Sequence, residues 1–385
     1  MAKVLLLGSF SKSLLAFRGH LIRRLLEEGH DVVAVAPDIS DDIAESLQSW
    51  GARCREVPMD RTGMNPAHDV RTLWDLHQLF VQEKPDIFLG YTIKPVVYGL
   101  LAAWVADIPS RYALITGLGT LFTDVRGMKQ YLLQTVASML YRFSLLTSHR
   151  AIFQNADDAY LFCARRLVGG PEQVALVNGS GVDLDQYRPV PLPETTTFLM
   201  IARLLRNKGV NEYVAAAERI KSHHPAVRFR LAGGRDDGPA AIPEEQLQQW
   251  IDGDTIEYLG YLDDIRPAMA QASVYVLPSY REGTPRTVLE AMAMGRPVVT
   301  TDVAGCRETV EPGDNGFLVE SKNVDSLARA MTHFIGEPEL TRTMGEYSRQ
   351  IAQKKYDVHQ VTDALLAALE LGTRKMPPPL PFDAA

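Results

Sequence analysis

Two glutamates on either side of an expected helix start are the residues whose spacing first suggests chemistry. Seven residues separate Glu282 from Glu290. Between them, Thr284 and Pro285 have the types of a capping residue followed by proline at the first helical position. A helix is therefore expected over about 285–294. Glu282 would lie in the loop before this helix, and Glu290 would lie within it.

The start of this helix also has the properties of an anion site. Its first backbone amides lack partners within the helix, and the helix dipole adds to their attraction for a diphosphate. A carboxylate about a turn and a half further in can accept both hydroxyls of a ribose, as an acidic residue does in dinucleotide folds. These features favour a nucleotide-sugar site built from Gly283, Thr284, Pro285, Arg286, Thr287 and Glu290. The alternative is one glutamate in an exposed loop and another on a solvated helix face.

Two cations in another segment are suited to neutralising such a diphosphate. Arg203 and Lys208 follow an expected strand at Thr197–Ile201. Each would contribute up to roughly 4 kcal/mol against a phosphate charge at about 4 Å in a medium of effective dielectric near 20, before desolvation is subtracted. The chain has no P-loop, no Gly-x-Gly-x-x-Gly fingerprint and no Asp-x-Asp pair at the end of an expected strand. We therefore expect phosphate binding without a metal ion or another cofactor. A solvated basic loop is the alternative.

The segment 279–297 resembles the Glu-x7-Glu signature of retaining GT-B glycosyltransferases of family 4. Further segments resemble the pattern of this family in the same order along the chain, at 178–183, 201–209, 229–234, 256–261 and 315–319. The resemblance implies that the catalytic residues are Glu282, Arg203 and Lys208, and it adds Gly233 and Tyr261 to the donor site. It also implies retention of the anomeric configuration, by same-face attack in which the leaving phosphate accepts the acceptor's proton.

The N-terminal half indicates the acceptor. Segments 90–99 and 115–122 resemble bacterial transferases that extend sugars on undecaprenyl diphosphate. Lys94 after one expected strand, and the turn of Thr116, Gly117 and Gly119 after another, would hold a diphosphate or a sugar through charge and backbone amides. A surface lysine without a ligand is the alternative for Lys94. Many family members have a histidine where Thr116 and Gly117 stand, so no catalytic histidine is carried over.

Length and composition fit two domains of ordinary globular type. The chain has 385 residues, of which 46% are hydrophobic and 23% charged, and its net charge is −7. This length suffices for two cores, and the negative charge argues against nucleic acid as a partner. Three scattered cysteines offer neither a disulfide framework nor metal-ligand spacing, which indicates a reducing cytoplasm. The first residues are typical of a buried strand rather than of a signal peptide.

Strands and helices are expected to alternate in two series, which predicts an α/β fold with two parallel sheets. The resemblance implies GT-B architecture, in which two doubly wound Rossmann-like domains face each other across a cleft. We expect an acceptor-binding domain at 1–187, a nucleotide-sugar-binding domain at 188–355, a helix at about 356–372 that packs back on the first domain, and a flexible tail at 373–385. One helix is expected at 14–28, and strands are expected at 4–7, 32–36, 54–57, 87–90, 112–115, 151–154, 197–201, 229–232, 256–258, 274–277 and 298–301.

The apolar segment 128–146 is a candidate membrane-contacting helix. Its only charged residues are Lys129 and Arg142, and Arg126 and Arg150 flank it. Such a helix would lie in the bilayer interface with its basic residues against anionic headgroups. The alternative is a helix packed across the first sheet. Because no run of 18 uncharged apolar residues is present, we expect a cytoplasmic protein held peripherally on the inner face of the cytoplasmic membrane.

These observations predict a metal-independent, retaining glycosyltransferase. Its expected substrates are a UDP-sugar, carrying an N-acetylhexosamine or a hexose, and a polyprenyl-diphosphate-linked saccharide of surface polysaccharide or glycan biosynthesis. A UDP-N-acetylglucosamine 2-epimerase of the same architecture is one alternative. A family 4 transferase with a soluble acceptor or a GDP-sugar donor is another. The third is a non-catalytic assembly protein with a nucleotide site, against which the intact charged residues of the site argue.

Overall fold

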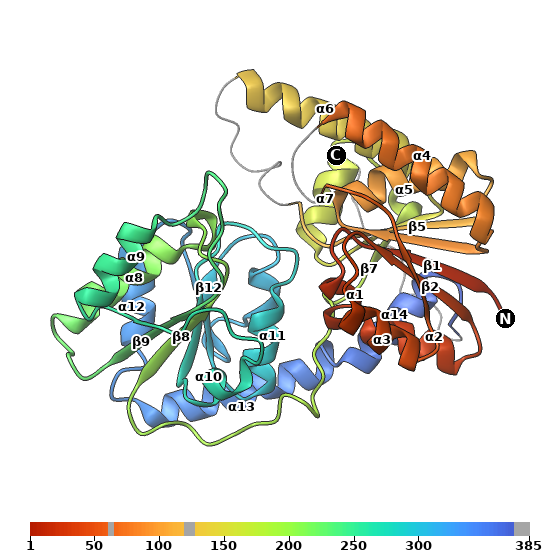
Figure 1. The fold of residues 1–385 in the computed structure, drawn as a ribbon. Helices are drawn as coiled ribbons and strands as arrows, with labels where there is room; N and C mark the ends of the chain where they lie inside the picture. The colour runs from red at the N-terminus through yellow and green to blue at the C-terminus, as the bar shows by residue number, and fades with distance from the viewer. Residues whose placement is uncertain (61–64, 119–127, 373–385) are drawn as a thin grey trace. The chain divides into compact units, whose positions relative to one another are not determined.

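The computed structural model describes residues 1–60, 65–118 and 128–372, and these form two compact α/β units (Figure 1). The first unit comprises Met1–Ser180 together with the described residues from His359 onward. The second unit comprises Gly181–Val358. The expected tail at 373–385 lies outside the described residues.

The boundary after Ser180 precedes the expected one at 187, because the next residues are fastened to the second unit. Val182 forms a β-bridge with Asp357. The guanidinium of Arg349 donates to the carbonyls of Leu184 and Tyr187 at 3.3 and 2.9 Å. Such tertiary hydrogen bonds leave no mark on local sequence patterns, so the boundary is a property of the folded chain.

A seven-stranded parallel sheet forms the centre of the first unit, with the order β3-β2-β1-β4-β5-β6-β7. The order reverses between β1 and β4, which is where ligands bind in doubly wound folds. The last strand was not predicted, because three residues are too few to show a periodic pattern. The strands are β1 (Lys3–Leu7), β2 (Asp31–Ala36), β3 (Arg53–Glu56), β4 (Ile87–Tyr91), β5 (Ser110–Ile115), β6 (Arg150–Phe153) and β7 (Val174–Leu176).

Helices cover both faces of this sheet (Figure 1). Side chains of β1 alternate between the two faces, so that Leu5 and Leu7 enter one core while Val4 and Leu6 enter the other. One face carries α4 (Pro66–Glu83), α5 (Ile93–Val105), α6 (Met128–Leu145) and α7 (Ala156–Ala164). The other carries α1 (Lys12–Ala16), α2 (Gly19–Glu27), α3 (Asp41–Ser49) and the returning α14 (Val358–Ala368).

The single helix expected at 14–28 is wrong, since the chain forms α1 and α2 with a turn between them. Arg18 occupies the turn and is almost completely buried. Its guanidinium carbon lies 5.0 Å from the centroid of the Tyr91 ring, at the end of β4. Arg18 therefore contacts a residue that is distant in the sequence, and the helical pattern of the segment does not show this contact.

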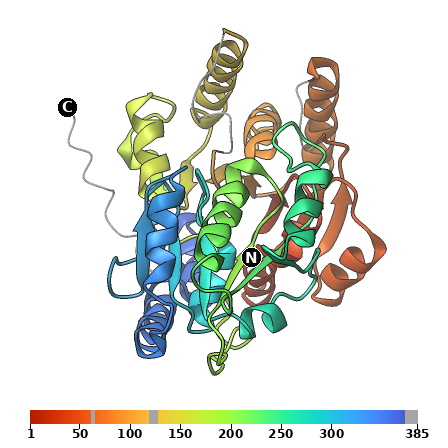
Figure 2. The ribbon, with the colours of Figure 1, turned by 90° about the vertical axis from the view of Figure 1, so that its left-hand side faces the viewer.

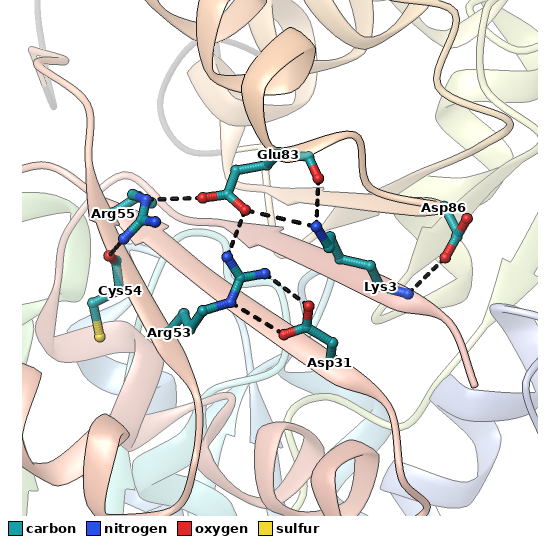
Figure 3. A network of polar contacts seen from close by, with 7 residues as sticks. All are labelled: Lys3, Asp31, Arg53, Cys54, Arg55, Glu83 and Asp86. Carbon is teal, nitrogen blue, oxygen red and sulfur yellow. Dashed lines mark hydrogen bonds and ion pairs between the residues drawn. The ribbon is translucent and has the colours of Figure 1, made fainter.

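Charged residues connect the amino-terminal ends of three strands to the end of α4 (Figure 3). The buried carboxylate of Glu83 accepts hydrogen bonds from Arg53 at 2.7 Å and Arg55 at 2.8 Å. Arg53 also holds Asp31 through two hydrogen bonds, and Lys3 Nζ donates to the Glu83 carbonyl. Burial by itself raises the pKa of Glu83, but the two arginines outweigh it, so the pKa lies below its usual value. This network connects the edge of the sheet at which these strands begin to the end of α4.

The second unit has a six-stranded parallel sheet with the order β10-β9-β8-β11-β12-β13, which reverses between β8 and β11. Its strands are β8 (Thr197–Ile201), β9 (Arg228–Ala232), β10 (Glu257–Tyr258), β11 (Val274–Leu277), β12 (Val298–Thr301) and β13 (Gly316–Val319). Helices α8 (Val210–Lys221) and α12 (Val324–Thr332) lie side by side (Figures 1 and 2), and α11 (Arg286–Ala293) packs on α13 (Pro338–Lys355). The remaining helices are α9 (Glu244–Asp252) and α10 (Arg266–Ala270).

One side of α6 packs on the sheet, and the other side is exposed. Tyr141 and Leu145 join the core of the first unit, so the alternative of a helix packed across the sheet is confirmed for this side. The exposed side carries Met128, Tyr131, Leu132, Leu133, Val136, Met139 and Phe143. Within the described parts of the chain, no helix combines the length and the apolar character needed to cross a bilayer.

Candidate active site

The loops after β8 and β11 lie where the strand order of the second sheet reverses. These two strands are parallel neighbours, so their carboxyl ends meet at one edge of the sheet. Open parallel sheets bind ligands outside such ends. Loop 202–209 follows β8 and loop 278–285 follows β11. The predicted catalytic residues all lie in these two loops.

Lys208 and Glu282 form an ion pair between the two loops. Lys208 Nζ lies 2.6 Å from Glu282 Oε1, with the side chains 20% and 14% exposed. The backbone supports this pair, because Tyr280 N donates to Asn207 O at 3.0 Å and Glu282 N donates to Ala304 O at 3.1 Å. The pair is thus held by main-chain hydrogen bonds, and both charged groups still reach solvent.

Glycines allow these loops to approach neighbouring backbone closely. Gly209 has φ +77°, and a Cβ built on it would lie 2.1 Å from the carbonyl oxygen of Pro278. The predicted donor residue Gly233 has φ +148°, and its Cβ would lie 1.7 Å from the carbonyl oxygen of Ala202. Both positions therefore require glycine for space and for conformation.

Arg203 has a different partner from the other two predicted catalytic residues. Its Nη1 donates to Asp236 Oδ2 at 2.9 Å, and the side chain is 54% exposed. Asp236 follows β9, the neighbour of β8. The structure therefore brings Lys208 and Glu282 together, whereas it pairs Arg203 with the loop after the next strand.

The helix between the two glutamates starts one residue later than expected. Pro285 is the N-cap residue of α11, with φ −71° and ψ 111°. The N-cap position, predicted at Thr284, thus falls on Pro285, because Pro285 is extended rather than helical. Gly283 and Thr284 still lie directly before the helix. A Cβ on Gly305 would lie 2.4 Å from the carbonyl oxygens of Glu282 and Gly283, so the turn after β12 packs closely under this loop.

Glu290 lies within α11 with its side chain only 6% exposed. Arg286 Nε donates to its Oε1 at 2.8 Å. Burial raises the pKa of Glu290, while Arg286 and Tyr187 act in the opposite direction. The guanidinium of Arg286, one turn earlier in the same helix, holds this buried carboxylate, which suits the acceptance of paired hydroxyls.

Thr287 and Tyr261, two further predicted donor residues, have different surroundings. Thr287 Oγ1 lies 2.6 Å from the hydroxyl of Tyr275, which also donates to the carbonyl of Ile201 at 3.1 Å. Thr287 thereby connects the first turn of α11 to the end of β8. Tyr261 is exposed, and its ring lies 3.5 Å from the Cβ position of Gly234. Thr287 thus supports the site, whereas Tyr261 is open to a ligand.

Two family models match the chain in succession. The one described as "Glycosyl transferase 4-like domain" matches residues 16–192, and the one described as "Glycosyl transferases group 1" matches residues 195–337. Together the matches span most of both units. The chain belongs to glycosyltransferase family 4.

Two bacterial relatives of this family 4 glycosyltransferase align with most of its length. The N,N′-diacetylbacillosaminyl-diphospho-undecaprenol alpha-1,3-N-acetylgalactosaminyltransferase of Campylobacter jejuni is 27% identical over 368 residues, which are 92% of this chain and 94% of the relative. The UDP-Gal:alpha-D-GlcNAc-diphosphoundecaprenol alpha-1,3-galactosyltransferase of Escherichia coli is 26% identical over 312 residues, 76% of each chain.

Solved structures share the fold of this glycosyltransferase at low sequence identity. Sucrose-phosphate synthase from Thermosynechococcus elongatus has a TM-score of 0.76 at 19% identity and covers 94% of this chain and 96% of its own. HepE of Anabaena in complex with UDP has a TM-score of 0.75 at 18% identity, with coverage of 96% and 99%. The predicted α/β fold with two Rossmann-like GT-B domains is confirmed.

In the first unit of this glycosyltransferase, Lys94 is buried at the start of α5. Its Nζ donates to Asp69 Oδ1 at 2.8 Å. The alternative of a surface lysine is therefore wrong, although Asp69 already balances the charge of Lys94. Thr116 and Gly117 follow β5, which neighbours β4. These acceptor candidates thus share one sheet edge, while the predicted Gly119 lies outside the described residues.

Sequence reasoning missed three residues of the candidate donor site, namely Asp236, Tyr275 and Gly305. Two of them reach the site by side-chain contacts that no local pattern indicates. Of these residues, only Gly305 could have been found from the sequence, since a glycine shortly after a buried strand is typical of close backbone approach. Within the described residues, no three His, Cys, Asp or Glu side chains form a group that would hold a metal ion.

Proposed function

We propose that this glycosyltransferase moves a sugar from a UDP-sugar to a polyprenyl-diphosphate-linked saccharide, with retention of configuration and without a metal ion. The sugar is an N-acetylhexosamine or a hexose, and the product belongs to surface polysaccharide or glycan biosynthesis. The observation that carries the proposal is the Lys208–Glu282 pair at the reversal point of the second sheet, directly before α11. The activities named for the Campylobacter jejuni and Escherichia coli relatives support the acceptor class.

The charges of the donor site match those that develop during the reaction. Breaking the C1–O bond of the sugar builds negative charge on the leaving diphosphate and positive charge on the sugar. Lys208 and the amides at the start of α11 stabilise the leaving diphosphate. Arg203 is exposed enough to exchange Asp236 for a phosphate. These groups supply the positive charge that a metal ion supplies in other transferases.

Glu282 has two tasks in the proposed mechanism. One oxygen holds Lys208 at 2.6 Å, which fixes the cation where the diphosphate leaves. The carboxylate also accepts hydrogen bonds from the donor sugar and eases its oxocarbenium-like charge. The acceptor hydroxyl attacks on the face from which the diphosphate departs, and a leaving phosphate oxygen takes its proton. No side chain is then required as a base.

The proposal includes peripheral attachment to the inner face of the cytoplasmic membrane through α6. The exposed side of this helix carries aromatic and aliphatic side chains from Met128 to Phe143. An apolar helix face of this kind gains free energy by entering the boundary between headgroups and acyl chains. Attachment would bring the enzyme to an acceptor whose polyprenyl chain lies in the bilayer.

A transfer assay tests the proposal. Purified protein in EDTA is incubated with a lipid-linked bacterial saccharide and one labelled donor at a time: UDP-N-acetylgalactosamine, UDP-N-acetylglucosamine, UDP-glucose or GDP-mannose. Label extracted into organic solvent from one UDP-sugar, and lost with Glu282→Ala, is the expected result. The anomeric coupling constant in the NMR spectrum of the product reports retention or inversion.

Other outcomes of this assay identify the alternatives. Conversion of UDP-N-acetylglucosamine to its epimer without acceptor would establish the epimerase. Label from GDP-mannose, or in a water-soluble product, would establish a different donor or a soluble acceptor. Transfer that stops in EDTA and returns with Mg²⁺ would contradict metal independence.

A further inference from the structure

Lys94 is a buried lysine at the edge of the first sheet where ligands bind. The chain leaves β4 at Tyr91 and enters α5 at Ile93, so Lys94 lies in the first turn of α5. This turn lies beside the point at which the strand order reverses between β1 and β4. The side chain of Lys94 is only 10% exposed. Lysine is almost never buried to this degree unless it is paired.

The partner of Lys94 comes from the first turn of another helix. Asp69 lies at the start of α4 with its side chain 12% exposed, and its Oδ1 accepts a hydrogen bond from Lys94 Nζ at 2.8 Å. The two helices pack on each other. The bond therefore brings the starts of both helices together at the carboxyl end of β4.

The ammonium group of Lys94 can make more hydrogen bonds than its partner accepts. A lysine has three N–H donors. Among the residues that the structure describes, Asp69 alone accepts a hydrogen bond from Lys94. Asp69 thus fixes the direction of one donor and leaves two donors for other acceptors. Because buried donors are expensive to leave without an acceptor, this group suits a ligand with several oxygens.

The residue two positions before Lys94 shows a second, independent feature. Thr92 has φ +71° and ψ 164°, a region of backbone conformation that is essentially restricted to glycine. Strain of this kind is found at ligand clamps, where the surrounding structure maintains it. The Oγ1 atom of Thr92 is buried, and no described residue hydrogen-bonds to it. The start of α5 therefore carries an unpartnered hydroxyl as well as an ammonium group with spare donors.

Positive charge exceeds negative charge where the two helices begin. The positive end of each helix dipole is equivalent to about half an elementary charge. Lys94 adds a full charge, whereas Asp69 is the one acidic residue in the described first turns of α4 and α5. A ligand that binds here is therefore expected to be an anion. The diphosphate is the anionic group of the proposed acceptor.

We propose that Thr92 and Lys94, with Asp69 holding Lys94, bind the diphosphate of the polyprenyl-linked acceptor. This inference rests on the proposed function. It assigns the charged part of the acceptor to the start of α5 and adds Thr92 to the residues that bind it.

Calorimetric titration with farnesyl diphosphate and with farnesol, in the same detergent, tests the inference. Saturating UDP is present, so that the donor site is filled. The wild type should bind farnesyl diphosphate at least about tenfold more tightly than farnesol, since hydrogen bonds to a charged group are at stake. The double variant Lys94→Met with Asp69→Asn should lose most of this preference. It should still fold, because replacing both partners leaves no unpaired buried charge.

Thr92→Val distinguishes binding from a structural role. It removes a hydroxyl that no described residue contacts and keeps the shape of the side chain. The melting temperature should therefore stay the same or rise, while the preference for farnesyl diphosphate falls about three- to tenfold. In the transfer assay, Thr92→Val should raise the acceptor KM and leave the donor KM unchanged.

Lys221→Met with Asp254→Asn is the matched control, because it removes a lysine–aspartate pair with a separation of 3.1 Å from the second unit. It should bind both lipids as the wild type does. Unchanged preference for the diphosphate in either the Thr92 variant or the Lys94 double variant would overturn the inference.

Failure of the proposed function gives a different result. A wild type that transfers label only to a water-soluble acceptor contradicts the proposed acceptor, and the inference fails with it. A wild type that transfers label to the lipid-linked saccharide but binds farnesol as tightly as farnesyl diphosphate contradicts the inference alone.

Discussion

At the residue scale, the charges of Lys208 and Glu282 balance each other before a ligand arrives. The two side chains lie 2.6 Å apart and are both partly exposed. A diphosphate that approaches Lys208 therefore meets a cation whose position is already set, and the free energy of reorganisation is small. Because of this pairing, we expect substitution of either residue to lower the transfer activity, although the two residues lie in separate loops.

Lys208→Ala and Glu282→Ala should each lower kcat/KM for transfer about 100- to 1,000-fold, because each removes a charge that acts in the transition state. Folding should be retained, since surface-near ion pairs contribute little to stability. The transfer assay and the circular dichroism melting curve measure the two effects. Lys221→Ala, which removes a lysine paired with exposed Asp254, is the control. Full activity in either site variant would show that the pair is not catalytic.

At the element scale, the turn after β9 must pass beside the backbone that leads to Arg203. Gly233 has φ +148°, and its missing Cβ makes room for the carbonyl of Ala202. Gly260 lies on the neighbouring turn with φ +70° and open space around its Cβ position. A comparison of substitutions at Gly233 and Gly260 therefore distinguishes a steric clash from an effect of backbone conformation alone.

Gly233→Ala should lower the free energy of unfolding of the second unit by about 2–4 kcal/mol and weaken UDP binding, because the added methyl must displace the loop that carries Arg203. Gly260→Ala should cost only about 1 kcal/mol, since its effect is backbone strain alone. Urea unfolding followed by the fluorescence of Trp250 measures the stability of this unit, after Trp50, Trp74 and Trp104 are replaced by phenylalanine. If both variants lose the same free energy of unfolding, the close approach of Gly233 to the Ala202 carbonyl is contradicted.

The helix α6 offers a second prediction at this scale. Leu132→Ser and Phe143→Ser each remove a large exposed apolar side chain. Each should weaken binding to anionic vesicles roughly five- to tenfold, since inserting one such side chain contributes about 1.5–3 kcal/mol when it is fully buried. Vesicle flotation measures the binding. Tyr347→Ser on the second unit is the control. Unchanged flotation of both α6 variants would exclude this helix as the attachment site.

At the scale of the whole molecule, stability also depends on groups far from the donor site. Glu83 connects the end of α4 with the starts of β1 and β3 in the first unit. The folded pKa of this carboxyl lies below its ordinary value of 4.5. Its contribution to stability is therefore fully present above that ordinary value, and it is lost as the pH falls through the folded pKa.

Glu83→Gln should lower the free energy of unfolding of the first unit by about 1–3 kcal/mol at neutral pH, because Arg53 and Arg55 lose a buried charged partner. The difference from the wild type should shrink below the ordinary pKa of 4.5. Urea unfolding at a series of pH values, followed by the three tryptophans of the first unit in a Trp250→Phe background, measures it. Glu339→Gln, in the exposed network of Arg342, should show no such difference. If the difference in unfolding free energy between Glu83→Gln and the wild type does not change with pH, the charge of Glu83 does not stabilise the first unit.

Much of the architecture was predictable because it depends on short-range patterns. The strands that pack on both faces of each sheet are continuous apolar runs, such as β1 and β8, and their burial follows directly. Residues 283–285 marked the start of α11 to within one residue, because glycine and proline restrict the backbone locally. Prediction failed at two places where the structure has contacts between distant residues. Arg18, at the break between α1 and α2, contacts Tyr91, and the residues after the boundary at Ser180 bond to Arg349.

The sequence by itself determined the two α/β units and the family, and it located the loops that carry the charges of the proposed donor site, because apolar periodicity and motif spacing act over a few neighbouring positions. Only the tertiary structure decided which of those charges meet. In the tertiary structure Lys208 forms an ion pair with Glu282, Arg203 forms one with Asp236, and the buried Lys94 forms one with Asp69. Ion pairs and hydrogen bonds act over a few ångströms in space, and chain order alone does not specify which side chains come that close.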